Sequence, residues 1–508
     1  MEAFNGILTL LTFFPLLGVL LMLLLSWFGR RDDELFKRIA VGTSIITFII
    51  SIVVLLMYDR GIAGLQLEDR ALWIPSLNIS YYLAVDGLSI LMVLLTTFIT
   101  MLSVAGSWTA ITEHVRSYYV LMLLLEAGML GVFLAQDLFL FYIFWEFTLV
   151  PMYFLIGIWG GAKRVYASIK FFLYTMAGSL LMLLAILYMG INYDTFALPD
   201  LIANVDFPAN VGRWLFLGFA IAFAIKVPLF PFHSWLPDAH TEAPTAGSII
   251  LAGILLKMGT YGFMRFNLPL FPEASAFFAP TIAVLAIIGI IYGAIVSFAQ
   301  SDVKRLVAYS SVSHLGFVML GIFSLNNAGL QGAILQGVNH GLSTGGLFYL
   351  VGVLYEQRHT REMSEFGGVW RAMPVFTALS LIITLSSMGL PGLNGFVGEF
   401  TILLGSMNAS PEVLQPQPWI YTAFAATGVI LAAVYLLWMF QRVFMGPLDN
   451  PANRTLKDVN GGQLAIMLSF LLFIFWIGIY PSPYFELVNE TVAALVSHVQ
   501  GAAIALIP

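Results

Sequence analysis

The chain has 508 residues, of which 60% are hydrophobic and only 10% are charged, and its formal net charge is −6. Soluble domains carry roughly 25% charged residues, so this composition excludes an ordinary soluble enzyme and indicates a multi-pass membrane protein. The sequence has no basic patch, which argues against a nucleic-acid partner. It has no cysteine, which excludes disulfides, thiolate-held iron–sulfur clusters and cysteine catalysis within the chain.

Apolar runs of about 18 or more residues recur along the chain and predict an all-α polytopic membrane protein with about 14 transmembrane helices. The first run has no positively charged segment before it and exceeds signal-peptide length, so we interpret it as a retained span. The segment from Tyr484 onward is expected to form a surface helix or tail. The predicted spans are centred near Leu17, Phe48, Leu94, Leu125, Phe147, Leu180, Ala220, Ile254, Ile287, Phe317, Leu342, Thr384, Val429 and Phe470.

The distribution of basic residues predicts the orientation of the chain. Lys226 and Lys257 lie inside spans. The loops after even-numbered spans hold few basic residues, namely Arg60, Arg70, Arg213 and Arg265. Every other lysine and arginine follows an odd-numbered span. Because basic residues accumulate in cytoplasmic loops, both termini are predicted to face away from the cytoplasm.

Two sets of five spans, the fourth to eighth and the ninth to thirteenth, share one feature. The fourth span of each set is interrupted, by Pro228 and Pro231 just after Lys226, and by Pro391 shortly before Glu399. Proline has no N–H group, and the carbonyls that it frees are tolerated at membrane depth only inside protein or beside water. Paired broken helices in oppositely oriented repeats indicate a transporter site.

This pattern predicts four domains. They are an N-terminal three-helix segment (1–110), a first five-helix repeat (116–267), a second, inverted five-helix repeat (276–445) and a last helix with a C-terminal tail (446–508).

Five ionisable residues other than histidine fall well inside the predicted spans: Glu126, Glu146, Lys226, Lys257 and Glu399. A charge at the bilayer centre costs about 2.5–3.5 kcal/mol on insertion scales, so each of these residues is a candidate functional group. Lys226 is the most plausible partner of Glu146, and two such buried groups titrate as a unit.

Each of these residues also has a structural interpretation. Glu146 could be neutral or locked in a static ion pair. Lys257 could extend its amine to the membrane surface. Glu399 could cap the second half of a broken helix, and Glu126 could face either the bundle or the lipid.

Two histidines, His314 and His340, lie in apolar spans among serines and Asn339. We interpret them as parts of a hydrated proton path rather than as core residues. His233 and His240 are expected at the helix break and its loop. They are not favoured as metal ligands, because no third ligand has suitable spacing.

Four aspartates stand near the starts of predicted spans. Asp137, Asp238 and Asp302 are expected to cap helices, and Asp86 to stabilise the start of its span or a nearby site. The sequence contains no Walker A motif, no GxGxxG motif after a strand and no histidine pair suited to haem. No cofactor and no metal site are therefore expected in this chain.

Four motifs resemble the antiporter-like membrane subunits of respiratory complex I, the NADH–quinone oxidoreductase. They are FWEFTLVPMYFLIGIWGG, KVPLFPFHSWLPDAHTEAPTAGSIILAGILLKMGTYGFMRF, QSDVKRLVAYSSVSHLGFV and LPGLNGFVGEF, between about Phe144 and Phe400. The terminal spans resemble the family only in number and hydropathy. The resemblance implies two half-channels for protons in inverted repeats, driven by redox chemistry in other subunits.

Individual roles follow from motif position. Glu146 resembles the family's glutamate of the fifth helix, Lys226 the lysine of the broken seventh helix, and Lys257 the lysine of the eighth. His314 and His340 match the connecting relay.

Glu399 matches the last residue of the family's proton path. Sister subunits of L and N type, which are the expected neighbours of this chain, carry lysine there. Glu126 and Asp137 match the family less closely.

The resemblance and the buried charges together suggest an electrostatic mechanism. A proton from the cytoplasm reaches Lys226 while Glu146 is ionised, and a charge change in a neighbouring subunit weakens that pair. The proton then passes through Lys257 and the histidines to Glu399. Three alternatives remain open at this point: a subunit of a multisubunit cation/proton antiporter, a quinone-binding redox subunit, and a passive scaffold.

Overall fold

The structure, a computed structural model, describes residues 5–504. The chain divides into two compact units. Unit 1 is drawn from Met1–Val227, Ile254–Phe278 and Glu486–Pro508, and unit 2 from Pro228–Gly253 and Ala279–Phe485. The outermost residues of the predicted first and last domains, 1–4 and 505–508, lie outside the described residues. The division into four domains stays a prediction.

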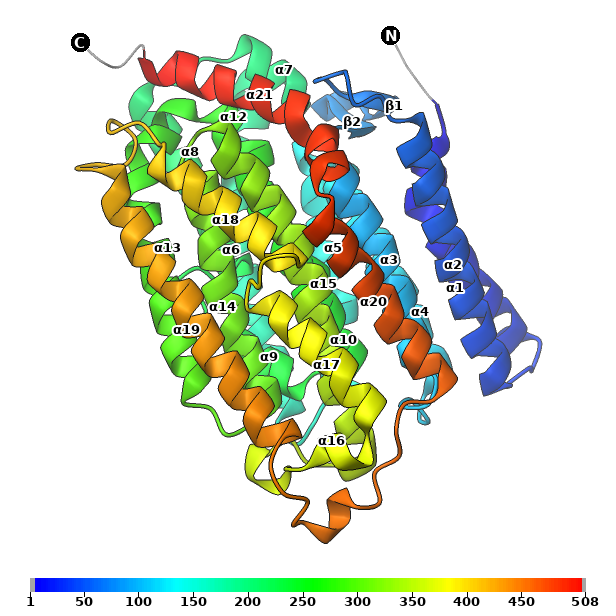
Figure 1. The fold of residues 1–508 in the computed structure, drawn as a ribbon. Helices are drawn as coiled ribbons and strands as arrows, with labels where there is room; N and C mark the ends of the chain where they lie inside the picture. The colour runs from blue at the N-terminus through cyan, green and yellow to red at the C-terminus, as the bar shows by residue number, and fades with distance from the viewer. Residues whose placement is uncertain (1–4, 505–508) are drawn as a thin grey trace. The chain divides into compact units, whose positions relative to one another are not determined.

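Unit 1 consists of helices and one two-stranded sheet (Figure 1). Its elements are α1 (Ile7–Trp27), α2 (Asp33–Met57), β1 (Gln66–Ile74), η1 (Pro75–Leu77), β2 (Ile79–Val85), α3 (Ile90–Gly106), α4 (Val115–Leu134), α5 (Leu138–Trp159), α6 (Arg164–Tyr193), α7 (Leu198–Asn204), α8 (Ala209–Lys226), α11 (Leu256–Gly262), η3 (Phe263–Asn267), α12 (Leu268–Leu270) and most of α21 (Ser482–Ile504).

The regular elements of unit 2 are all helices among its described residues. Its elements are α9 (Trp235–Glu242), α10 (Thr245–Ile250), most of η2 (Leu251–Leu255), most of α13 (Pro272–Phe298), α14 (Val303–Ile322), α15 (Asn327–Arg358), η4 (Met363–Glu365), α16 (Val369–Ala372), α17 (Pro374–Ser387), α18 (Asn394–Met407), α19 (Pro418–Phe444), η5 (Pro451–Asn453) and α20 (Gly461–Ile479).

The prediction of a polytopic helical membrane protein is confirmed, whereas the count of fourteen spans is not settled by helix length and composition. Among the described residues, 11 helices are long and apolar enough to cross a membrane. Three further predicted spans correspond to α3, to α15 and to the pair α17 and α18. α3 has only 17 residues and α17 and α18 have 14 each, and α15 carries many polar residues.

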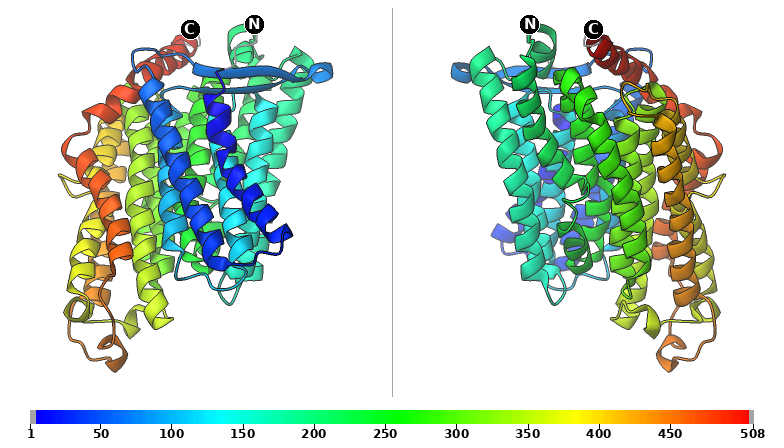
Figure 2. Two further views of the ribbon diagram at one scale, coloured as in Figure 1. Left: turned by 90° about the vertical axis from the view of Figure 1, so that its right-hand side faces the viewer. Right: turned by 90° about the vertical axis from the view of Figure 1, so that its left-hand side faces the viewer.

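The β-hairpin is the main element that the sequence prediction of an all-α chain missed. β1 and β2 pair antiparallel, and Asp69 from β1 accepts hydrogen bonds from the Gly6 and Thr9 backbone amides at the start of α1. Figure 2 shows the hairpin lying across the ends of neighbouring unit 1 helices. The hairpin therefore caps the first helix of the bundle.

Both predicted helix breaks are present. α8 ends at Lys226, and helical structure resumes with α9 at Trp235. α17 ends at Ser387 and α18 begins at Asn394, with Gly389 and Gly392 at φ 80° and 92° between them. A left-handed backbone of this kind is accessible to glycine without steric cost. The helix predicted after Tyr484 is also confirmed and forms α21.

Candidate proton-transfer site

The lysine at the first helix break is fully buried in unit 1. Lys226 is the last residue of α8, and its Nζ lies 5.2 Å from the ring centroid of Trp145 and 5.7 Å from that of Phe171. Cation–π contacts of this kind stabilise a desolvated ammonium group. Within the described chain, Nζ makes no hydrogen bond. The amine is therefore held by aromatic faces and remains available to a hydrogen-bonding partner.

Glu146 lies one residue after Trp145 on α5 and is only half-buried. Its Oε1 has no hydrogen-bond partner among the residues that the structure describes. No hydrogen bond therefore joins Lys226 Nζ to Glu146, and their partnership stays a prediction.

Lys257 lies on α11, which packs closely on the helix that carries Lys226. α11 stands between two π-helical segments, η2 and η3, which are often found at functional sites. A β-carbon added to Gly259 would lie 2.8 Å from the Phe223 carbonyl oxygen of α8, and one added to Gly262 would lie 2.5 Å from the Phe223 ring. The Lys257 side chain is fully buried, so it does not extend to a surface of the chain.

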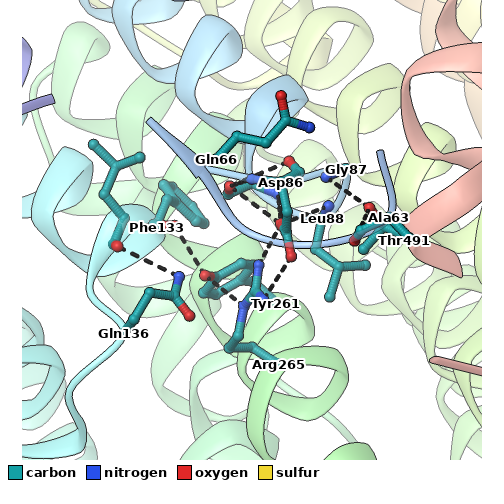
Figure 3. A network of polar contacts seen from close by, with 12 residues as sticks. Ala63, Gln66, Asp86, Gly87, Leu88, Phe133, Gln136, Tyr261, Arg265 and Thr491 are labelled. Carbon is teal, nitrogen blue, oxygen red and sulfur yellow. Dashed lines mark hydrogen bonds and ion pairs between the residues drawn. The ribbon is translucent and has the colours of Figure 1, made fainter. Parts of the chain in front are cut away.

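A buried ion pair anchors the end of the Lys257 helix (Figure 3). The Arg265 guanidinium donates to both carboxylate oxygens of Asp86, with a distance of 2.7 Å between Nη1 and Oδ2. Arg265 Nε donates to the Tyr261 hydroxyl, which donates to the Phe133 carbonyl of α4. Asp86 also accepts from the Leu88 backbone amide at the start of α3.

This network corrects one prediction and refines another. Arg265 was placed in a loop from hydropathy alone, but it is buried in η3. Asp86 does stabilise the start of its span, and it is also the counter-ion of Arg265. Charge spacing along the sequence carried no signal for a pair separated by 179 residues.

In unit 2, Glu399 is the centre of a second group of buried polar residues. It lies on α18, where its Oε1 is 2.8 Å from His314 Nδ1 of α14 and accepts from Gln336 Nε2 of α15 at 3.1 Å. His314 Nε2 is 3.1 Å from the Tyr435 hydroxyl of α19. Four helices therefore converge on one acid–base pair, and Glu399 does not act as a helix cap.

His340 lies beside this pair, with its ring centroid 6.0 Å from that of His314. About one turn after His340 on α15, the Ser343 hydroxyl lies 2.6 Å from the Ser386 hydroxyl. Ser386 donates to the Asn394 side chain. These contacts line the second helix break with polar groups, because Asn394 is the first residue of α18.

Sequence reasoning missed Gln336 and Tyr435 as partners of the acid–base pair. Gln336 lies one helical turn before His340 on the same face of α15, which is a signal that could have identified it. Tyr435 carries no such signal, because its contact with His314 spans 121 residues.

The remaining aspartates and histidines cap helices or contact neighbouring side chains. Asp137 and Asp302 cap α5 and α14, as predicted, by accepting backbone hydrogen bonds. Asp238 lies inside α9 instead of capping a span, and its Oδ1 is 4.0 Å from Arg305. The His240 ring stacks on Phe348 at 4.6 Å.

The His233 ring lies against the Tyr292 ring, with 5.0 Å between the ring centroids. Across residues 5–504, no group of three or more His, Cys, Asp or Glu side chains is placed to hold a metal ion.

Comparison with known proteins identifies the family of the chain. The family model described as NADH:quinone oxidoreductase/Mrp antiporter, TM, matches residues 135–417. The chain is 42% identical to NADH-quinone oxidoreductase subunit M of Rhodobacter capsulatus, covering 97% of each chain. It is 40% identical to NADH-ubiquinone oxidoreductase chain 4 of Marchantia polymorpha, covering 95% of this chain and 96% of the relative.

Solved structures give the same result. A chain of respiratory complex I from Thermus thermophilus superposes with a TM-score of 0.86 at 33% identity, covering 97% of this chain and 99% of that chain. The Mrp complex from Dietzia sp. gives a TM-score of 0.83 at 19% identity, covering 98% and 99%, a likeness in fold alone. With buried acids and bases at both helix breaks and close relatives along almost its whole length, the chain belongs to the NADH:quinone oxidoreductase/Mrp antiporter family of membrane subunits.

Proposed function

We propose that the chain is the M-type, proton-translocating membrane-arm subunit of an NADH–quinone oxidoreductase. The observation that carries this proposal is the near-full-length similarity to subunit M proteins, combined with buried acid–base groups at both helix breaks. The chain takes part in the enzyme as a subunit, and the redox reaction and its cofactors belong to other subunits.

We assign proton transfer to six side chains. In unit 1, Glu146, Lys226 and Lys257 form the loading group. In unit 2, His340, His314 and Glu399 form the release group. The hydrogen-bonded pair of His314 and Glu399 supports this assignment, because a histidine and a carboxylate 2.8 Å apart can exchange a proton without moving.

The driving step is a change in electrostatic pairing. Lys226 keeps its proton while Glu146 is ionised, because a nearby negative charge favours the charged form of a lysine. A charge change in the neighbouring L- or N-type subunit withdraws Glu146 from Lys226, and the unpaired ammonium then gives its proton to the next acceptor. Moving one charge across the membrane costs about 2.3 kcal/mol per 100 mV, so the step needs redox energy from the rest of the enzyme.

The location and partners of the chain follow from this function. It is placed as a multi-pass protein of the bacterial inner membrane, with both termini on the non-cytoplasmic side and with lipid and other membrane-arm subunits around it. The excess of lysine and arginine in the loops after odd-numbered spans supports this orientation. Reassigning Arg265 to a helix strengthens the asymmetry.

A subunit of a multisubunit cation/proton antiporter is the second candidate, favoured by the fold shared with the Mrp complex. At 19% identity that likeness covers fold alone, whereas the relatives named subunit M reach 42%. The first candidate is therefore preferred.

The substitution Glu146→Gln tests the proposal, since it keeps the size of the side chain and removes its charge. In membranes in which the complex assembles, proton pumping is expected to be lost, because Lys226 no longer has a switchable partner. Substitution of exposed Glu113 by Gln is the control. Intact pumping in Glu146→Gln would show that the loading group is wrongly assigned.

A further inference from the structure

Glu126 is a buried acid that the loading and release groups do not use. It lies near the middle of α4, it is fully buried, and neither carboxylate oxygen has a hydrogen-bond partner in the described part of the chain. Buried polar atoms nearly always have a partner, which is either protein or ordered water. A fully buried carboxyl group without a protein partner therefore indicates a site for water.

Three hydroxyl groups nearby share this property. Thr100 and Ser103 on α3 and Tyr119 on α4 are fully buried, and their oxygens have no hydrogen-bond partner among residues 5–504. Tyr119 lies seven residues before Glu126, close to two helical turns, so the two side chains share one face of α4.

The register of α3 against α4 puts these groups at matching depths. The Ser107 and Tyr118 hydroxyls are 2.9 Å apart near the short connection between the two helices, which therefore run antiparallel. Thr100 lies seven residues before Ser107, and Glu126 lies eight residues after Tyr118. At 1.5 Å per residue, both are about 11 Å from this contact, so they lie at the same level.

α2 supplies a third polar face at the same levels. The Ser51 and Thr97 hydroxyls are 2.8 Å apart, which fixes the antiparallel register of α2 and α3. That register places Thr47 within one residue of the level of Thr100, and Ser44 within one residue of the level of Ser103, and both α2 side chains are fully buried. Hydroxyl groups of α2 and α3 therefore lie at about the same depth as Glu126 of α4.

Charged residues stand at the end of this region where α2 begins and α3 ends. Lys37 of α2 pairs with Glu34 at 3.1 Å, and its Nζ lies 5.7 Å from the Trp108 ring centroid in the connection between α3 and α4. This end follows odd-numbered spans and is the cytoplasmic end in the proposed orientation.

We propose that α2, α3 and α4 enclose a water-filled proton path that leads from the Glu34–Lys37 end of unit 1 to Glu126. The proton moves along water molecules and the hydroxyls of Ser103 and Thr100. The Glu126 carboxylate accepts it from the last water molecule. When the carboxylate returns the proton to water, its charge is restored and no other bond changes. The path brings protons to unit 1 separately from the break at Lys226.

Several other titratable groups lie on the elements that pack against α4. They are Asp137 and Glu146 on α5 and Lys257 on α11. The Tyr261 hydroxyl, one turn beyond Lys257, donates to the α4 carbonyl of Phe133, two turns beyond Glu126. The Glu126 face of α4 therefore continues to the Lys257 helix, which makes Lys257 the natural recipient. This last step rests on the proposed function.

The test is Glu126→Gln in the assembled complex, with exposed Glu113→Gln as the matched control on the segment before α4. Infrared difference spectra recorded during turnover are expected to show a protonated carboxyl band that shifts in D₂O, present in the wild type and the control and absent in Glu126→Gln. Proton uptake by inverted vesicles is expected to slow severalfold. A carboxyl band that does not shift in D₂O, or proton uptake by Glu126→Gln at the wild-type rate, would overturn the path.

A second variant covers the case in which Glu126→Gln does not assemble. Thr100→Val keeps the shape of the side chain and removes its hydroxyl. It should slow the exchange that shifts the Glu126 band in D₂O, and it should slow proton uptake. Rates equal to wild type would contradict the path. Lys226→Ala measured in parallel separates the two proposals: if it abolishes pumping while the Glu126 and Thr100 variants pump normally, only the path is wrong.

Discussion

The two carboxylate oxygens of Glu399 have different surroundings. His314 and Gln336 contact the same oxygen, Oε1, and a β-carbon on Gly389 would lie 3.2 Å from the other, Oε2. The open backbone of the helix break therefore faces the second oxygen. Such a group can keep its position while its protonation changes.

Replacing Glu399 by Gln tests this role. The amide keeps the size of the side chain and can still hydrogen-bond to His314, so the complex should assemble, but it cannot accept the proton. NADH-driven acidification of inverted vesicles should be lost, whereas exposed Glu412→Gln should behave as the wild type. Normal acidification in an assembled Glu399→Gln complex would remove Glu399 from the proton path.

The Asp86–Arg265 pair is expected to act as a structural anchor for the Lys257 helix. Removing one partner of a buried ion pair costs about 3–5 kcal/mol, because the remaining charge is uncompensated. Asp86→Asn and Arg265→Gln should each lower the unfolding temperature of the detergent-solubilised complex. The double variant should lose much less than the sum of the two, since neither charge remains. Additive losses would show that the pair does not interact energetically.

At the scale of elements, glycines decide how closely the helices of unit 2 approach. A β-carbon on Gly405 of α18 would collide with the backbone of Gly329 on α15, and one on Gly398 would collide with the Gln336 side chain. The contact between Gln336 and Glu399 depends on this close packing of α15 on α18.

Gly405→Ala should therefore separate the two helices. Overpacking of this kind costs about 1–3 kcal/mol, so the unfolding temperature should fall, and pumping should fall as Gln336 moves away from Glu399. Gly461→Ala at the start of α20 is the control, because no atom lies within 4 Å of its β-carbon position. Equal stability of the two variants would contradict this view of the interface.

Elements were predictable where the sequence carried a local signal. Proline located both helix breaks, and the length of each apolar run located most spans. The hairpin was missed because β1 and β2 lie between two apolar helices, and hydropathy assigned that region to a loop. Arg265 was misplaced for a related reason, since only its distant partner Asp86 makes a buried arginine tolerable there.

At the scale of the whole molecule, the orientation in the membrane can be tested because the chain has no cysteine of its own. Ala162→Cys lies before α6 and Ala203→Cys lies near the end of α7, and both positions are exposed. A membrane-impermeant thiol reagent should label Ala162→Cys only from the cytoplasmic side and Ala203→Cys only from the other. The opposite labelling would invert the proposed topology.

The sequence predicted the family and the types of buried charge, but not how those charges are paired. Glu399 and His314 were expected in one proton path, yet their direct contact depends on helix packing that no local pattern encodes. Likewise, Glu146 and Lys226 were expected as partners, and only the structure places aromatic rings, rather than the carboxylate, against the amine. Pairing is a property of the packed bundle.

Lys226→Ala tests whether protons cross the membrane through this chain. NADH–quinone reductase activity and proton translocation would be recorded together in membranes where a native gel shows the assembled complex, with exposed Lys163→Ala as the control. Pumping and coupled turnover are expected to be lost in Lys226→Ala and retained in Lys163→Ala. An assembled Lys226→Ala complex that moves as many protons per NADH as the wild type would contradict a proton path through this chain.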